Sequence, residues 1–150
     1  MNNLSTRLAE IEISYKPKIA NHPIIKTSGD TYNHIAKFFP IETISLQEKF
    51  VVGYLNAANR LIGVYEMSRG GITNTIVDLR LLLAVALKTA STGVVLAHNH
   101  PSGNLKPSNS DREITERVKD ACKLFDIKLL DHLILSPNNN YFSFVDEGIL

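Results

Sequence analysis

Cysteine is scarce in this sequence, which contains only Cys122. A single cysteine cannot form a disulfide within the chain, so the fold is expected to hold together without a covalent bridge. Cys122 lies beside apolar residues such as Ala121 and Leu124, where nothing would lower the pKa of its thiol. We therefore predict a small buried thiol and not a nucleophile.

An excess of charge is also missing, because 16 lysine and arginine residues are balanced by 15 aspartate and glutamate residues, for a formal net charge of +1. Such a chain has no global field to attract nucleic acid or an anionic membrane, and either partner would need a local patch. No segment reaches the roughly 18 uncharged apolar residues of a membrane span, and the first residues lack the order of a signal peptide. We expect a cytoplasmic protein with no membrane partner.

Internal repeats, low-complexity tracts and long linkers are absent as well, so the 150 residues are expected to form one domain. The spacing of apolar residues predicts both strands and helices. The first predicted elements are an extended arm over residues 1–27 with one edge strand at 11–15, and a short helix that has Ser28 as its N-cap and runs up to Pro40. They are followed by a β-hairpin of residues 49–55 and 61–67, a largely buried helix 79–87 capped by Asp78, a central strand 94–97 and a helix 109–125.

The segment HNHPSGNLKPSNSD, residues 98–111, concentrates the reactive side chains of the sequence. At the end of an extended strand, residues i and i+2 project to the same side. His98 and His100 can therefore direct their imidazoles toward one point while Asn99 faces away. Asp111 falls in the first turn of the following helix, from which its carboxylate can reach back to the two imidazoles. This pattern predicts a site with three ligands for one metal ion.

Two histidines and one carboxylate are the ligand set of a catalytic zinc site, which leaves one position open for water. Structural zinc sites close that position with cysteine, and only one cysteine is available here. Water beside the metal becomes a nucleophile when a base takes its proton. Glu48 and Glu66, at the entry and the exit of the predicted hairpin, are the two candidate bases, and periodicity does not choose between them.

These residues also have structural interpretations. Ser108 and Asp111 fit a capping box at the start of a helix, and Asp111 taken alone is better explained as a cap. A lone histidine is usually a hydrogen-bonded surface residue, and we interpret His22, His34 and His132 in this way. Two histidines followed by an acid at a helix start are rarer than any of the parts, and the combination favours a metal site.

The segments EKFVVGYLN, GGITNTIVDLR, AHNHPSGNLKPSNSD, LLDHLIL and YFSF appear in an order that resembles the RadC-type branch of the JAMM (MPN-like) metalloprotease family. The resemblance covers residues 47–150 as the family domain, after an N-terminal arm and short helix in residues 1–46. It implies an α/β fold of the JAMM/MPN (cytidine-deaminase-like) kind, with a mixed β-sheet flanked by helices. The family signature, a glutamate followed by His-x-His, ten residues and an aspartate with a serine three residues before it, fits without a gap.

The resemblance also implies a role for each residue. The implied zinc ligands are His98, His100 and Asp111. Glu48 is the glutamate that matches the family and would take a proton from zinc-bound water, so Glu66 becomes structural. Ser108 would donate a hydrogen bond to the developing oxyanion, a type of contact often worth about 3 kcal/mol. The implied function is zinc-dependent hydrolysis of a peptide or isopeptide bond in a peptide or protein substrate.

Two other functions stay open. The branch is traditionally labelled as DNA repair, so the runner-up is an accessory protein in DNA repair or mobile-element biology that binds nucleic acid. Its basic contacts near the site would be Lys106, Arg112, Arg117 and Lys119, which are otherwise interpreted as a solvated helix face. Residues 1–46 are too short and too poor in glycine hairpins for the helix-hairpin-helix domain that the branch often carries.

The other alternative is a metal-bound but inactive scaffold. Intact ligands weigh against it. The sequence leaves open the identity of the substrate and the oligomeric state. Selectivity is expected in the loops 70–77 and 136–140.

Overall fold

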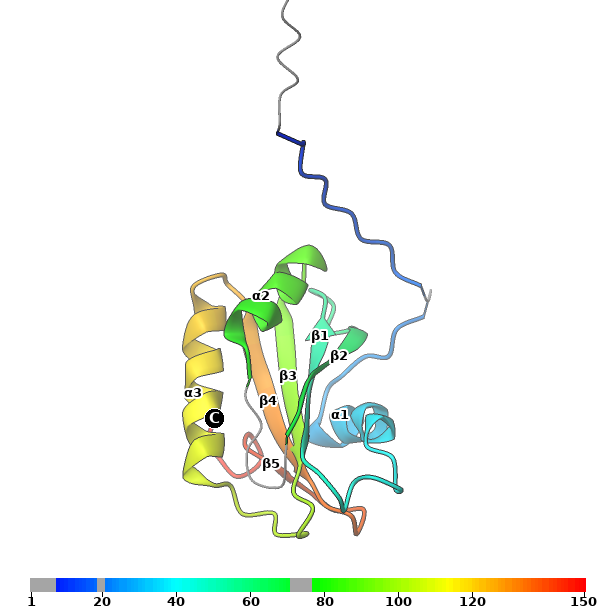
Figure 1. Ribbon diagram of the computed structural model, residues 1–150, viewed down its shortest axis with the longest axis vertical. Helices are drawn as coiled ribbons and strands as arrows, with labels where there is room; N and C mark the ends of the chain where they lie inside the picture. Colours follow the sequence, from blue (N-terminus) through cyan, green and yellow to red (C-terminus); the bar gives the residue numbers. More distant parts are fainter. Residues whose placement is uncertain (1–7, 19–20, 71–76) are drawn as a thin grey trace, which may run out of the picture.

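The computed structural model describes residues 8–18, 21–70 and 77–150 (Figure 1). Its helices are α1 (Ser28–Ile35), α2 (Leu79–Lys88) and α3 (Asn109–Lys123), with a short 3₁₀ helix, η1 (Ala36–Phe38), directly after α1. Its strands are β1 (Lys49–Leu55), β2 (Leu61–Arg69), β3 (Gly93–Asn99), β4 (Lys128–Leu135) and β5 (Tyr141–Ser143). None of these helices is long and apolar enough to span a bilayer.

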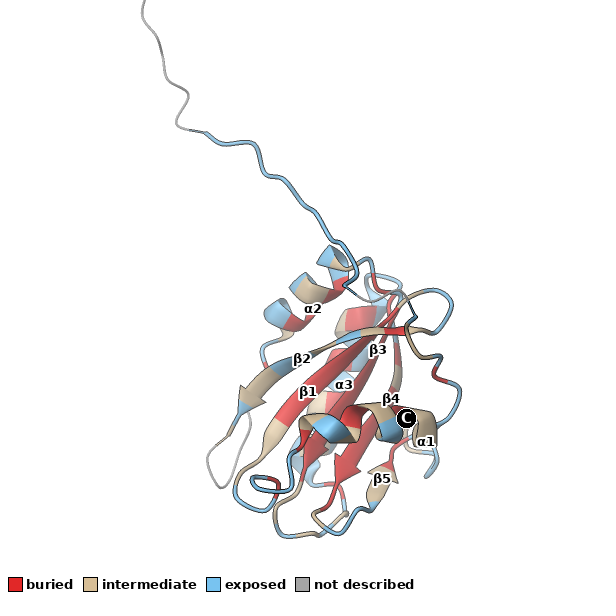
Figure 2. Cartoon of the chain, turned by 90° about the vertical axis from the view of Figure 1, so that its right-hand side faces the viewer, coloured by how far each residue is buried: buried red, intermediate tan, exposed pale blue. Residues whose placement is uncertain are grey.

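The strands of the described chain form one mixed sheet in the order β2-β1-β3-β4-β5. β1 is antiparallel to both β2 and β3, β3 is parallel to β4, and β5 is antiparallel to β4. The parallel pair requires a crossover connection, and α3 lies within it. In Figures 1 and 2, α1 covers one face of the sheet while α2 and α3 cover the other. This arrangement confirms the predicted α/β fold with a mixed sheet flanked by helices.

The core lies on both faces of the sheet, because successive side chains of the central strands point in opposite directions. On one face Leu96 belongs to a cluster with Leu82 of α2 and Val118 of α3. On the other face Val95 belongs to a cluster with Ile35 of α1. Every residue of β3 is buried, which confirms the predicted central strand. The strand that leads to the two histidines is therefore held from both sides.

Local capping signals explain where the helices begin. The carboxylate of Asp78 accepts hydrogen bonds from the first backbone amides of α2, as predicted. The predicted N-cap of the first helix lies one residue too late, because Ser28 is the first residue of α1 and the N-cap is Thr27, which forms a capping box with Asp30. Cys122 is buried in α3, and burial raises the pKa of its thiol to about 11. The prediction of an unreactive buried thiol is thereby supported.

Two predictions are wrong, one about the run 11–15 and one about the burial of α2. The alternating run 11–15 forms no strand within residues 8–18, and its isoleucines are exposed. Alternation does not suffice, because a strand needs a partner with which to exchange hydrogen bonds. Helix α2 is not largely buried either, since Leu82 and Ala86 are its buried residues and Leu87 is 54% exposed. Only one side of this apolar helix contacts the core.

Candidate metal centre

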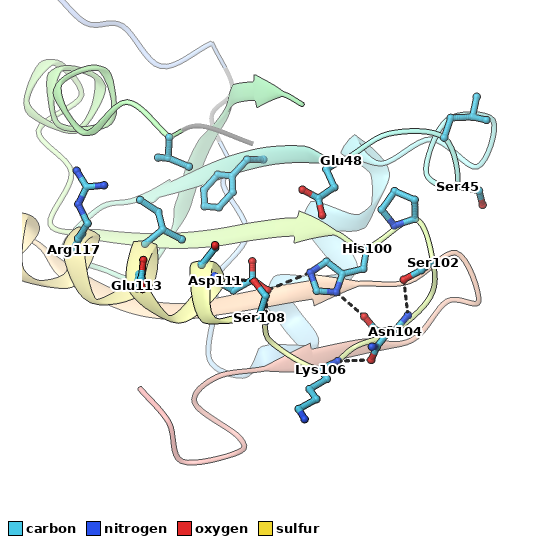
Figure 3. A pocket seen from close by; sticks show the side chains of 16 residues that line it. Ser45, Glu48, His100, Ser102, Asn104, Lys106, Ser108, Asp111, Glu113 and Arg117 are labelled. Carbon is cyan, nitrogen blue, oxygen red and sulfur yellow. Dashed lines mark hydrogen bonds and ion pairs between the residues drawn. The ribbon is translucent and has the colours of Figure 1, made fainter. Parts of the chain in front are cut away.

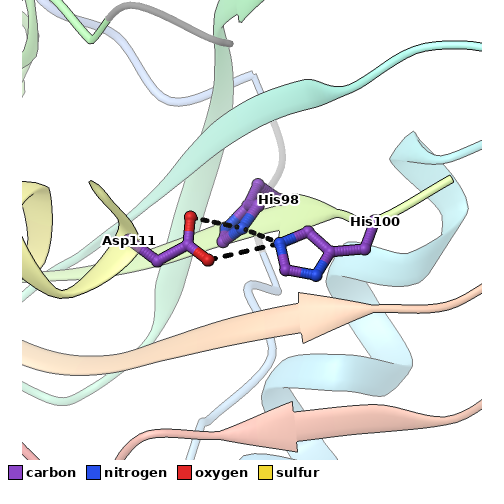
Figure 4. Close-up of side chains that lie close together, drawn as sticks. All are labelled: His98, His100 and Asp111. Atoms are coloured by element: carbon purple, nitrogen blue, oxygen red, sulfur yellow. Dashed lines mark hydrogen bonds and ion pairs between the residues drawn. The ribbon is translucent and has the colours of Figure 1, made fainter. Parts of the chain in front are cut away.

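The end of β3 presents two imidazoles on one face of the sheet. His98 lies within β3 and His100 follows the strand directly, and both side chains turn toward Asp111 at the start of α3 (Figure 4). His98 is 1% exposed, whereas His100 borders the solvent. One imidazole is thus anchored in the core while the other stands at the surface.

The first turn of α3 brings the carboxylate of Asp111 to these imidazoles. Ser108 is the N-cap of α3, and its Oγ accepts a hydrogen bond from the amide of Asp111 at 3.1 Å. In return, Oδ2 of Asp111 accepts one from the amide of Ser108 at 2.7 Å. The same carboxylate lies beside both rings, with Oδ1 at 3.1 Å from Nε2 of His98 and Oδ2 at 3.3 Å from Nε2 of His100. The capping box therefore does not compete with a ligand role, because it holds Asp111 where the carboxylate meets both rings.

The donor atoms of these three side chains lie at distances that suit one shared cation. The two Nε2 atoms of His98 and His100 are 3.0 Å apart, and each is 3.1 or 3.3 Å from an oxygen of Asp111. Ligands bound to zinc at about 2.0–2.2 Å in a tetrahedron are separated by about 3.3–3.6 Å, so the three observed separations reach this spacing with shifts of a few tenths of an ångström. The observed spacing therefore fits a zinc ion.

The hydrogen bond on the far side of the His100 ring also fits a metal ligand. Its Nδ1 lies 2.6 Å from the carbonyl oxygen of Asn104. A carbonyl oxygen can only accept, so Nδ1 carries the proton and a neutral ring keeps its lone pair on Nε2. Nε2 is the atom that faces Asp111 and His98, so the available lone pair points into the shared space.

The electrostatics of the site favour a cation. Burial raises the pKa of Asp111, but the adjacent rings of His100 and His98, which donate hydrogen bonds to it when they are protonated, outweigh burial and hold this pKa far below its usual range. For His100 burial acts in the other direction and lowers the pKa. Hydrogen bonds to Asp111 and to the backbone carbonyl of Asn104, together with the negative charges of Asp111 and Glu48, outweigh burial, so the pKa of His100 is raised overall. The carboxylate therefore stays charged, and its charge favours any cation placed between the rings.

A cleft of about 880 Å³ opens beside His100 and Asp111 (Figure 3). Its wall includes His100 and Asp111, together with Glu48 and Ser108. The apolar part of the wall is formed by Leu46, Phe50, Val77, Pro101 and Ile114. The candidate metal centre is thus accessible to a molecule considerably larger than water.

The two candidate bases lie in different places. Glu48 directly precedes β1 and lies in the cleft wall near His100 (Figure 3). Glu66 lies on β2, where its carboxylate is 3.2 Å from Nζ of Lys49 and 2.5 Å from Nε of Arg69. Glu66 does not line the cleft, so the geometry leaves Glu48 as the candidate base.

Asn99, between the two histidines, fastens the segment that carries Glu48. Its side chain is 1% exposed and points to the opposite face of the sheet. Its Nδ2 donates to the carbonyl oxygens of Ile44 at 2.8 Å and Gln47 at 3.0 Å, and its Oδ1 accepts from the amide of Lys49 at 2.8 Å. Three consecutive residues of one strand end therefore serve two purposes, since the outer two face the candidate metal centre and the middle one anchors the candidate base.

The sequence interpretation of His132 as a surface residue is wrong. His132 lies in β4, is 0% exposed, and places its Nε2 at 2.8 Å from Nδ1 of His98. Its own Nδ1 is 2.6 Å from Oγ1 of Thr115 in α3. The signal that pointed to this position is the polar pair Asp131-His132 inside the apolar run LLDHLIL, because polar groups within a buried strand need hydrogen-bond partners.

Of the four basic residues considered for nucleic acid, Lys106 and Arg117 line the cleft, whereas Arg112 and Lys119 do not. The carboxylates in the same wall belong to Glu48, Asp111 and Glu113. The cleft therefore carries charges of both signs. Of the loop 70–77, in which we expected selectivity, residues 71–76 lie outside the described residues.

A family model described as the RadC-like JAB domain matches residues 25–149. This match confirms the resemblance in the sequence and extends it upstream from residue 47. A UPF0758 protein of Flavobacterium johnsoniae is 49% identical over 102 residues, which cover 68% of this chain and 44% of that protein. A UPF0758 protein of Porphyromonas gingivalis is 36% identical over 145 residues, covering 97% of this chain and 64% of that protein. A third, from Aquifex aeolicus, is 41% identical over 104 residues, covering 69% and 45%. The chain thus spans less than two thirds of the length of these relatives.

Proposed function

Because this chain belongs to the RadC-like JAB domain family, we propose that it is a zinc-dependent hydrolase that cleaves a peptide or isopeptide bond. The observation that carries this proposal is the meeting of His98, His100 and Asp111 beside a cleft. Their donor atoms all lie within 4.8 Å of one another. Two imidazoles and one carboxylate are the ligand set of zinc sites that keep a position open for catalysis.

The two imidazoles and the carboxylate would hold the ion. When bound, zinc supplies a Lewis acid that lowers the pKa of water to about 7 and polarises a carbonyl group. His98 and His100 offer Nε2, since Nδ1 of each ring is engaged elsewhere. The capping box keeps Asp111 from turning away, which reduces the conformational freedom that binding would otherwise remove.

Glu48 is the proposed general base. Its carboxylate accepts a proton from water as the water oxygen attacks the carbonyl carbon of the scissile bond. A new C–O bond forms in this step. Glu48 then delivers the proton to the amine nitrogen as the C–N bond breaks, so the products are a carboxylic acid and an amine, which transfer one further proton to become carboxylate and ammonium. The hydrogen bonds of Asn99 support this role, because they fix the backbone on both sides of Glu48.

Ser108 is the proposed donor to the oxyanion. Its Oγ accepts from the amide of Asp111, and this leaves the hydroxyl proton free to point into the cleft. A preorganised donor of this kind typically contributes about 2.7–4 kcal/mol to the stabilisation of the transition state. The N-cap and the catalytic role are compatible, since one hydroxyl both accepts and donates.

Metal analysis of the purified protein followed by a cleavage screen tests this function. Wild-type protein is expected to bind about one zinc per chain, and His100→Ala to lose it. His34→Ala, a histidine variant outside the cleft, serves as the matched control and retains the metal. Wild-type protein then cleaves members of a library of peptides and of isopeptide-linked lysines, whereas His100→Ala does not. Equal zinc content in all three proteins would refute the assignment of the site.

The nucleic-acid function remains the second candidate, because Lys106 and Arg117 line the cleft. For variants that lack His98 and His100, this function predicts that activity is retained, whereas the hydrolase function predicts that it is lost. A salt-dependent affinity for DNA that survives the loss of His98 and His100 favours this function, whereas hydrolysis depends on both histidines.

A further inference from the structure

A buried chain of hydrogen bonds runs from His98 to the backbone of Asp111. Nδ1 of His98 lies 2.8 Å from Nε2 of His132, and Nδ1 of His132 lies 2.6 Å from Oγ1 of Thr115. Oγ1 of Thr115 donates to the carbonyl oxygen of Asp111 at 2.5 Å. The chain thus connects β3, β4 and α3, beginning on one candidate ligand and ending on another.

The directions of these hydrogen bonds follow from the carbonyl at the end of the chain. A carbonyl oxygen only accepts, so the single hydroxyl proton of Thr115 is committed to Asp111. Thr115 can then only accept from His132, which places a proton on Nδ1 of His132. The neutral ring of His132 has its lone pair on Nε2 and accepts from Nδ1 of His98. His98 therefore keeps its own lone pair on Nε2, the atom that faces His100 and Asp111.

The surroundings of this chain hold the two rings in place. His132 is 0% exposed and Thr115 is 1% exposed, so water does not compete for their hydrogen bonds. The ring of Phe144 stacks on His132 with centroids 4.7 Å apart, and the ring of Phe50 stacks on His98 at 5.8 Å. Rotation of either imidazole would require these aromatic rings to move.

We propose that His132 and Thr115 are positioning residues that hold His98 in the tautomer with its lone pair on Nε2 and couple its orientation to the first turn of α3. Neither residue lines the cleft. They act through His98 and Asp111, and they prepare the site before a metal arrives. The expected effect on zinc affinity rests on the proposed function. The tautomer of His98 does not, because it is a property of the metal-free protein.

The experiment compares Thr115→Val with Thr115→Ser. Valine matches the shape of threonine but removes the hydroxyl, and serine keeps it. Without the hydroxyl, His132 loses the acceptor that fixes its proton on Nδ1, so both tautomers of His98 become accessible. The zinc affinity of Thr115→Val is expected to fall by about 10- to 100-fold, as for other residues that orient metal ligands. Thr115→Ser should restore most of this affinity.

Thr31→Val provides the matched control. Thr31 is also buried, at 2% exposure, and its hydroxyl also donates to the carbonyl four residues earlier in a helix, but it lies in α1 on the other face of the sheet. Its zinc affinity should equal that of the wild type. A general weakening of the fold would affect Thr31→Val as well, whereas loss of the positioning chain affects only Thr115→Val.

A second readout needs no variant. Long-range ¹⁵N–¹H spectra of metal-free wild-type protein with labelled histidine, recorded at pH 8, report which nitrogen of each ring carries the proton. The inference predicts Nδ1 for both His98 and His132. A proton on Nε2 of His98 overturns it, even if Thr115→Val does not fold.

These outcomes separate the inference from the proposed function. If wild-type protein binds zinc through His98 and Thr115→Val binds it equally well, the positioning role is refuted and the proposed function stands. If wild-type protein binds no zinc, the proposed function fails, and the tautomer spectrum alone decides the positioning role.

Discussion

Asn99 allows the most informative single substitution, because it supports the candidate base without facing the candidate metal centre. Asn99→Ala removes three hydrogen bonds, to Ile44, Gln47 and Lys49, from the segment that precedes β1. The carbonyl of Ile44 is buried, whereas the bonds to Gln47 and Lys49 are only partly buried, so water can replace them in part.

The expected magnitude follows from these contacts. A buried polar group that loses its partner costs about 1–3 kcal/mol, and a replaceable hydrogen bond costs about 0.5–1.5 kcal/mol. The free energy of unfolding should therefore fall by about 4 kcal/mol, which lowers the Tm of a chain of this size by about 8–16 °C. Glu48 also loses its fixed backbone, so kcat should fall by about tenfold, which is less than the roughly 10²- to 10⁴-fold that a general base contributes, because the carboxylate itself is still present.

The assay combines thermal unfolding, competition of the protein with a chromophoric zinc chelator, and steady-state hydrolysis. Asn99→Ala should lower Tm and kcat and leave zinc affinity unchanged, because His98 and His100 point to the other face of the strand. Asn33→Ala, an exposed asparagine of α1, is the control and should change none of the three. An unchanged Tm would refute the structural argument. A loss of zinc affinity as large as in His100→Ala would show that Asn99 does not act through Glu48.

Further predictions concern single groups of the site and the core. Glu48→Gln should retain zinc and stability while kcat falls by about 10²- to 10⁴-fold, and retained turnover in steady-state assays would exclude this base. Ser108→Ala should lower the free energy of unfolding by about 1 kcal/mol in urea titrations and kcat by about 10²- to 10³-fold; a loss of stability alone would leave Ser108 as a cap only. The pKa of His100 is raised above its ordinary 6.5, so protonation of His100 stabilises the metal-free fold fully below pH 6.5 and this contribution is lost as pH rises through the higher folded value. Zinc-loaded protein should show the opposite trend in chemical denaturation, since protons compete with the metal for the ring. Cys122, whose pKa burial raises to about 11, should react with Ellman's reagent at pH 8 only after unfolding, and fast reaction of the folded protein would contradict its burial.

The parts of the fold that were predictable depend on local rules. The alternation of side chains in a strand places His98 and His100 on one side and Asn99 on the other. A short apolar run between turn residues indicates a central strand, and β3 lies at the centre of the sheet. The capping box of Ser108 and Asp111 is equally local, and the structure shows that this box and the approach of Asp111 to the imidazoles occur together.

The parts that were not predictable depend on strand pairing. His132 reaches His98 because β4 is parallel to β3 with Leu96 opposite His132, and no local pattern specifies this register. The contact of Thr115 with His132 requires in addition that α3 packs on that face. Periodicity likewise does not choose between Glu48 and Glu66, because the ion pair of Glu66 with Lys49 depends on the register of β1 and β2. The ion pair of Glu66 with Arg69 is local, since the two residues lie three apart in β2. The N-terminal arm shows the same dependence on pairing. Its run 11–15 alternates like a strand, but it pairs with no strand of the described chain and therefore forms none.

Anomalous diffraction from a crystal of the zinc-loaded protein, recorded on both sides of the zinc absorption edge, tests the central claim most directly. We expect one strong peak per chain, about 2.0–2.2 Å from Nε2 of His98, from Nε2 of His100 and from an oxygen of Asp111, with a side open to the cleft. A map without a peak between these residues, or with zinc bound elsewhere while Asp111 bonds only to its own helix, would contradict it.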